Sequence, residues 1–271
     1  MTPRPQSCGF VYVATGPKYV AEACASAATL RTAMPSAQIA LITDFSPGPE
    51  AARLFSHVTL RPDAERRPID KLLAWYAPFD RCVFLDTDTL IAGDITDLFD
   101  LLDSFDLAAT VETLRGLHYT LPDVPASFSE YNTGVVVFRR TPEVAAFFKT
   151  WREDYDRLHA SHGFVSDQPA FRWAAFRSQI RIAPVPSEYH FITTTPNYVM
   201  WQARLLHGRN NLPGLAQEIN SHLGARVYVP RLGIIHPFQG RRTWLQQLIR
   251  LGVHALRMAI YTTHRELMLE H

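Results

Sequence analysis

Short apolar runs alternate with helical patterns over the first half of the chain, and no other feature limits the possible folds as much. Apolar runs of strand length lie at 10–15, 38–43, 57–60, 81–85, 106–111 and 133–138, and helical patterns lie at 19–34, 69–76 and 94–102. This alternation predicts an α/β protein with a mostly parallel sheet and helices on both faces. The run at 81–85 (Arg-Cys-Val-Phe-Leu) is almost entirely apolar, which is typical of a strand buried on both faces.

The composition is that of a folded domain and gives no sign of a polyanionic partner. Hydrophobic residues make up 47% of the chain, and the formal net charge is +1, so we expect no nucleic acid partner. The cysteines, Cys8, Cys24 and Cys82, are odd in number and form no Cys-x-x-Cys pattern, which favours a reducing cytosol. We find no signal peptide and no membrane-spanning run of about 18 apolar residues, and therefore expect a cytoplasmic protein.

Small or polar residues follow several of the predicted strands. They are Thr15-Gly16, Asp86-Thr87-Asp88 and Glu112. In sheets of this kind, ligands bind at the carboxyl ends of the strands. These residues are therefore the first candidates for a binding site.

The two carboxylates of Asp86 and Asp88 lie close together in any extended conformation, because residues two apart in a strand have Cα atoms about 6.6 Å apart. Such a pair repels unless a cation lies near it, and a hard divalent ion would satisfy both carboxylates. A solvated turn in which one Asp caps the next helix is the alternative without a ligand. The string Val-Phe-Leu-Asp-Thr-Asp-Thr-Leu also resembles the first motif of haloacid-dehalogenase-like phosphatases, which need a later Lys; the chain offers only Lys149.

Ordered motifs extend over most of the chain. They are F-V-Y-V-A-T-G-P-K-Y (10–19), I-D-K-L-L-A-W-Y (69–76), R-C-V-F-L-D-T-D-T-L-I-A-G-D-I-T-D-L-F (81–99), D-L-A-A-T-V-E (106–112), Y-N-T-G-V-V-V-F (131–138), S-D-Q (166–168) and I-I-H-P-F-Q-G-R-R-T-W (234–244). Together they resemble the retaining glycosyltransferases of family eight, the glycogenin-like and bacterial galactosyltransferase-like enzymes. The resemblance implies a GT-A fold with a Rossmann-like sheet.

The resemblance also implies a donor-binding site for a nucleotide sugar, with UDP as the favoured nucleotide. Its residues would be Val13, Thr15, Gly16, Tyr19, Lys71, Asp86, Thr87, Asp88, Glu112, Asn132, Thr133, Gly134, Gln168, Gly240 and Arg242. Gly16 stands where the family often has Asn, and Glu112 where it usually has Asp. Arg242 and Trp244 match the Lys and Trp of the family's Lys-Pro-Trp, while Thr243 replaces the proline.

By the same resemblance, Asp86, Asp88 and His236 would hold a divalent metal. Mixed oxygen and imidazole ligands favour Mn²⁺ over Mg²⁺. The catalytic residues would be Lys71, Asp167 and Gln168, and retention would proceed by same-face attack or through a covalent intermediate. A protein that binds a nucleotide sugar without turnover is a further alternative.

The chain divides into a predicted GT-A domain at 1–241 and a helical segment at 242–268, and we interpret 269–271 as the start of a vector-encoded tag. The helix at 242–260 either docks on the core or contacts the inner face of an anionic membrane. The stretches 113–130 and 186–231 show little periodicity, and we expect the acceptor to bind there. The acceptor class stays open among a glycan, a lipid-linked saccharide, a small molecule and a protein.

Overall fold

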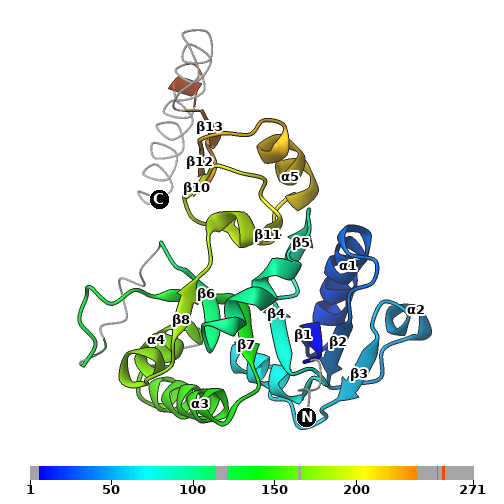
Figure 1. Cartoon of the computed structure of the whole chain (residues 1–271), viewed down its shortest axis with the longest axis vertical. Coiled ribbons are helices and arrows are strands. Elements are labelled where there is room, and N and C mark those ends of the chain that lie inside the picture. The colour runs from blue at the N-terminus through cyan, green and yellow to red at the C-terminus, as the bar shows by residue number, and fades with distance from the viewer. Residues whose placement is uncertain are drawn as a thin grey trace, which may run out of the picture.

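A seven-stranded sheet forms the centre of the computed structural model, with the strand order β3-β2-β1-β4-β7-β6-β8 (Figure 1). The structure describes residues 6–113, 121, 123–163, 166–236, 249 and 252–253. The strands are β1 (Cys8–Ala14), β2 (Ile39–Thr43), β3 (His57–Leu60), β4 (Arg81–Leu85), β6 (Leu107–Val111), β7 (Tyr131–Arg139) and β8 (Ile182–Pro184). All neighbouring pairs are parallel except those of β7, which runs antiparallel to β4 and to β6. The predicted mostly parallel α/β sheet is thus confirmed.

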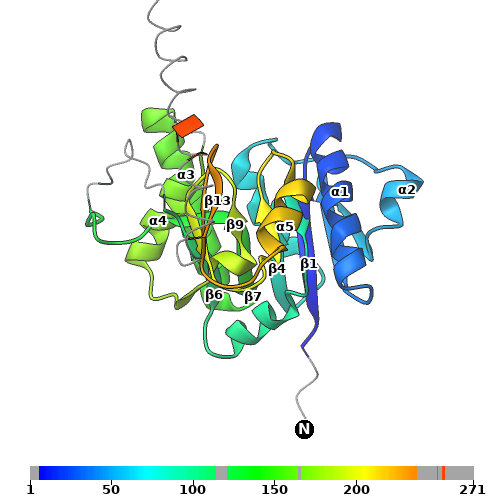
Figure 2. The same ribbon diagram turned by 90° about the horizontal axis from the view of Figure 1, so that it is seen from above.

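Helices cover both faces of this sheet (Figure 2). One face packs against α1 (Pro17–Ala33) and the 3-10 helix η2 (Thr96–Asp103). The other packs against η1 (Pro68–Tyr76), α3 (Pro142–His162) and α4 (Gln168–Arg177). Alternate residues of one strand enter different cores: Val83 and Leu85 face α1, whereas Cys82 and Phe84 face α3. This is why every residue of β4 after Arg81 is apolar.

The 186–231 region differs from the expectation of an irregular stretch, because most of it folds into two small sheets and a helix. Strands β5 (Thr89–Ile91), β11 (Leu205–His207) and β9 (Phe191–Ile192) form one sheet, and β10 (Asn197–Val199), β12 (Arg226–Val229) and β13 (Gly233–Ile235) form the other. Helix α5 (Leu212–Asn220) and the short η3 (Ser187–Tyr189) belong to the same region, whereas the short helix α2 (Pro49–Ala52) lies between β2 and β3. Strands of two to four residues are too short for periodicity to reveal them.

Of the segment 242–268, the structure describes only Ile249, Gly252 and Val253, so the predicted helix and the domain boundary at 241 lie outside the described residues. The same holds for 114–120 and for residue 122 within the predicted acceptor stretch. Among the residues that are described, no helix is both long and apolar enough to cross a bilayer.

Candidate functional site

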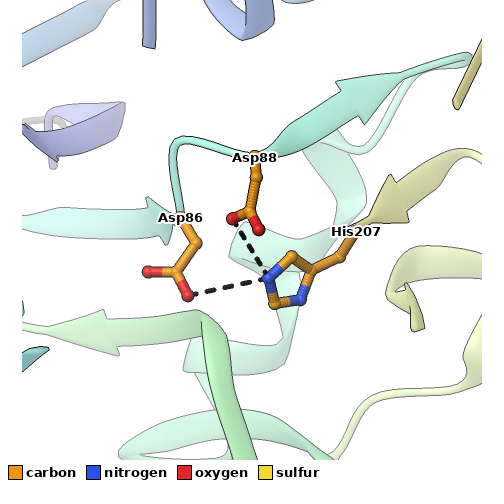
Figure 3. A group of neighbouring side chains, drawn as sticks. All are labelled: Asp86, Asp88 and His207. Carbon is orange, nitrogen blue, oxygen red and sulfur yellow. Dashed lines mark ion pairs between the residues drawn. The ribbon is translucent and has the colours of Figure 1, made fainter. Parts of the chain in front are cut away.

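Two aspartates and a histidine meet at the carboxyl end of β4 (Figure 3). Asp86 directly follows β4, Asp88 directly precedes β5, and His207 is the last residue of β11. Nε2 of His207 lies 3.3 Å from Oδ1 of Asp88 and 3.7 Å from Oδ2 of Asp86. One ligand atom from each of the three residues lies within 4.8 Å of the others. The three side chains therefore surround a common point.

Strand pairing brings His207 to this point. β11 runs antiparallel to β5, and in their register His207 stands opposite Thr89. Because Thr89 directly follows Asp88, this pairing fixes the imidazole beside the carboxylate. The small sheet thus supplies the third member of a cluster that begins on the large sheet.

The structure does not bring His236, predicted as the third ligand, to the aspartate pair. His236 follows β13, in the sheet formed with β12 and β10, and its ring packs against the ring of His222 with centroids 5.9 Å apart. β13 pairs only with β12 among the described strands and does not reach β5. The described residues that gather around Asp86 and Asp88 in ligand geometry include His207 and not His236.

The donor set of this cluster fits a divalent cation. Carboxylate oxygens together with one imidazole suit Mn²⁺, and two carboxylates alone would suit Mg²⁺. Burial raises the pKa of Asp86, in spite of the nearby charges of Lys71 and His207. At Asp88 burial acts in the same direction, but the hydrogen bond and charge of His207 and the charge of Arg209 outweigh it and lower the pKa. A cation held between these carboxylates would favour the ionised form of both.

Gly134 leaves the space that the His207 ring occupies. A Cβ at this position would lie 2.7 Å from Nδ1 of His207 and closer still to Cε1. It would also lie 3.0 Å from Oδ1 of Asn132, which accepts a hydrogen bond from the Gly134 amide. The close approach to the backbone at Gly134 is therefore made by the imidazole of His207.

A buried lysine connects the aspartate cluster to the start of α4. Nζ of Lys71 lies 3.2 Å from Oδ2 of Asp167 and 3.8 Å from Oδ1 of Asp86, and it donates to Oγ1 of Thr133 at 2.9 Å. Burial disfavours its charge, but Asp167 and Asp86 outweigh burial and raise the pKa of Lys71. Thr133 in turn donates to Asp167 at 2.7 Å. Removal of one partner from such a buried pair costs about 3–5 kcal/mol.

A second polar group lies beside the bulge between β6 and β7. Asn132 donates to Oε2 of Glu112 at 2.8 Å, and the Gln168 amide donates to the same oxygen at 3.5 Å and to the Tyr131 carbonyl at 3.3 Å. Glu112 and Asn132 are both buried. The structure thus brings together three residues that the sequence predicted for donor-sugar binding.

A cavity of ≈ 330 Å³ opens in front of Asp86, Asp88 and His207. Its walls include the predicted residues Val13, Thr15, Tyr19, Lys71, Asp86, Thr87, Asp88 and Asp167. Gly16 lies beside it at φ 89, a conformation open mainly to glycine, and its amide donates to Asp44. Gly240 and Arg242 lie outside the described residues.

Arg209 also lines this cavity and was missed from the sequence. Its guanidinium lies 3.2 Å from Oδ2 of Asp88 and 3.2 Å from Oε2 of Glu22, which also accepts from Thr87. Arg209 follows His207 by two residues. The string His-Gly-Arg after a short apolar run was therefore the sequence feature that could have indicated a binding residue here.

Comparison with known proteins identifies the fold. No model of a known protein family matches the chain, and no curated protein matches its sequence. Among solved structures, the galactosyltransferase LgtC in complex with donor and acceptor sugar analogs is similar at TM-score 0.52 and 16% identity, over 75% of this chain and 87% of that one. The apo form of the glycosyltransferase GlyE from Streptococcus pneumoniae TIGR4 is similar at TM-score 0.55 and 15% identity, over 79% and 59%. The bifunctional glycosyltransferase WbbM is similar at TM-score 0.52 and 14% identity, over 78% and 47%.

These similarities show that the chain has the fold of GT-A glycosyltransferases. The fold expected from the sequence motifs is thereby confirmed.

Proposed function

We propose that this protein is a metal-dependent retaining glycosyltransferase that moves a hexose from a nucleoside diphosphate sugar to an acceptor hydroxyl. The convergence of Asp86, Asp88 and His207 on the wall of one cavity carries this proposal, because these side chains come from two sheets and together offer the ligand atoms of a divalent cation. The family resemblance favours UDP as the nucleotide. The GT-A fold supports the same class of reaction.

The leaving nucleoside diphosphate gains negative charge as the glycosidic bond breaks, and this charge is the main obstacle to the reaction. Asp86, Asp88 and His207 would hold a Mn²⁺ or Mg²⁺ ion, which when bound supplies Lewis-acid stabilisation of the diphosphate. Lys71 and Arg209 would add fixed positive charge at the same oxygens. Arg209 supports this role because its guanidinium already lies 3.2 Å from Asp88.

The donor sugar would lie toward Glu112, Asn132 and Gln168, whose side chains form one hydrogen-bonded group. Gln168 is a poor nucleophile, and Asp167 is held by Lys71 and Thr133. We therefore favour same-face attack through an oxocarbenium-like state, stabilised by Asp167 or Gln168, over a covalent intermediate.

The phosphatase alternative lacks its lysine. Nζ of Lys149 pairs with Glu153 at 3.9 Å, and its side chain is 79% exposed on α3. Lys149 does not line the cavity in front of Asp86 and Asp88. We therefore favour the transferase.

The test is a screen of nucleotide sugars with Mn²⁺ that measures release of the nucleoside diphosphate with and without added acceptors. We expect release with one donor, its loss in chelator, and its loss in the Asp88→Asn variant with an unchanged circular dichroism spectrum. Full activity in chelator would refute the metal role. Binding of the donor by calorimetry without transfer or hydrolysis would instead favour the non-catalytic alternative. The screen should cover glycans, lipid-linked saccharides, small molecules and proteins as acceptors.

A cytoplasmic location, with a peripheral contact of residues 242–260 at the inner face of the membrane, is a further part of the proposal. Fractionation of the full chain and of a variant lacking 242–271 tests it. Equal distribution of the two between soluble and membrane fractions would refute a membrane role for this segment.

A further inference from the structure

A second histidine, His190, contacts the ring of His207 at Nδ1. His190 lies between η3 and β9, and its side chain is fully buried. Nε2 of His190 lies 2.9 Å from Nδ1 of His207, which is hydrogen-bond distance, and the two rings are nearly parallel with centroids 5.1 Å apart. His190 does not line the cavity that His207 lines, so any effect it has on a ligand passes through His207.

The two nitrogens of His207 have different surroundings. Nε2 faces the carboxylates of Asp86 and Asp88, whereas Nδ1 faces only His190 among the described hydrogen-bond partners. An imidazole that binds a metal through Nε2 must carry its proton on Nδ1, and that proton needs an acceptor. Nε2 of His190 is at the right distance to be this acceptor.

We propose that His190 is a positioning residue, which accepts a hydrogen bond from Nδ1 of His207 and so keeps Nε2 of His207 unprotonated toward the metal. This inference rests on the proposed metal-dependent function. It assigns a role to a residue that none of the sequence motifs contains.

The surroundings of His190 indicate that it does more than stabilise the fold by packing. With Nε2 as the acceptor, its single proton lies on Nδ1, and this atom is buried with no hydrogen-bond partner among the residues that the structure describes. A buried donor without a partner disfavours folding, so an apolar residue of similar volume would suit this position better if packing alone mattered. The loss of stability from the unpartnered Nδ1 proton has a functional reason if Nε2 of His190 is needed to orient His207.

Two substitutions separate the hydrogen bond from the packing. His190→Gln keeps an acceptor near the position of Nε2, whereas His190→Leu fills a similar volume without one. Mn²⁺ affinity is measured on the purified full chain from the electron paramagnetic resonance signal of free Mn²⁺. Loss of such an outer contact typically weakens metal binding about 10–100-fold, so we expect that loss in His190→Leu and a change of less than about threefold in His190→Gln. Wild-type affinity in a folded His190→Leu protein overturns the proposal.

A measurement on the unaltered protein covers the case in which the leucine variant does not fold. Long-range ¹⁵N–¹H spectra of the wild-type protein, loaded with one equivalent of diamagnetic Zn²⁺, report the protonated nitrogen of each imidazole. We expect the proton of His207 on Nδ1 and the proton of His190 on Nδ1. A proton on Nε2 of His190 in the loaded protein refutes the inference.

Failure of this inference is distinguishable from failure of the proposed function. Mn²⁺ binding that is lost in Asp88→Asn but kept in His190→Leu overturns only the role of His190. Wild-type protein that binds no Mn²⁺, or binds it equally well as Asp88→Asn, overturns the metal site itself and with it the role of His190.

Discussion

The close contact between Gly134 and the His207 ring yields a prediction in which metal affinity falls while the fold persists. In a Gly134→Ala variant, the added Cβ would lie 2.7 Å from Nδ1 of His207 and closer still to Cε1, so the ring falls at least about 0.7 Å short of ordinary van der Waals contact at 3.4 Å. The neighbouring atoms of β7 are fixed by pairing with β4 and β6, so the imidazole must move. Its movement carries Nε2 away from Asp86 and Asp88.

The size of the effect follows from the tolerance of metal ligands. Metal–ligand distances hold to about 0.2 Å, so a ring displaced by at least about 0.7 Å can no longer bind the same ion as the carboxylates. We expect Mn²⁺ affinity to fall at least about 10-fold, which corresponds to about 1.4 kcal/mol. Overpacking of this kind costs about 1–3 kcal/mol in stability, so the fold should persist.

The assay is Mn²⁺ titration of Gly134→Ala followed by electron paramagnetic resonance, together with urea denaturation. Gly48→Ala is the matched control, because a Cβ at Gly48 meets nothing within 4 Å and its φ of −61° suits alanine. The control should bind Mn²⁺ as the wild type does. If Gly134→Ala also keeps wild-type affinity, His207 is not held where the metal needs it and the reasoning is wrong.

Three further predictions address the ligand, the diphosphate and the acid stability of the fold. His207→Ala should weaken Mn²⁺ binding about 10–100-fold, whereas His236→Ala should change it less than about twofold; the reverse order would restore the original assignment. Arg209→Ala should weaken binding of the nucleoside diphosphate in calorimetry about 10–100-fold, as expected for the loss of a charge-assisted hydrogen bond of about 1.5–3 kcal/mol, and unchanged affinity would exclude a phosphate contact. Burial would raise the pKa of Asp106, but hydrogen bonds from Arg181 and Arg139 outweigh it and lower the pKa. Its ionised form therefore stabilises the fold above the unfolded pKa of about 3.9, and this contribution is lost as pH falls further. Asp106→Asn should accordingly lose less stability than the wild type between pH 7 and pH 3 in urea denaturation, and an equal loss would contradict this.

Local sequence predicted the large sheet because both of its faces are covered. β4 is apolar at every position after Arg81, and residues with small or polar side chains follow it directly. The contacts among Lys71, Thr133 and Asp167 also join residues that the motifs singled out. The strand and the polar residues after it could be predicted because each depends on a few neighbouring residues, whereas Lys71 on η1 and Asp167 before α4 were found only through the family resemblance of their motifs.

The smaller sheets could not be predicted in this way. Strands β9, β11 and β13 have two or three residues each, so their sequences carry too few positions to show alternation. Arg209 and His190 lie in this part of the chain, and each acquires its place from a partner far away in sequence. The bond between His190 and His207 depends on the parallel pairing of β9 with β11.

The sequence by itself determined the α/β class, the central strand β4 and the aspartate pair that follows it, because burial on both faces leaves a local apolar signal. It did not determine which histidine joins the pair. Leu205-Leu206-His207 and Ile234-Ile235-His236 have the same local pattern, two apolar residues and then a histidine. Only tertiary structure distinguishes them: β11 pairs with β5 beside Asp88, while β13 pairs with β12, and strand pairing is a long-range choice that no short motif encodes.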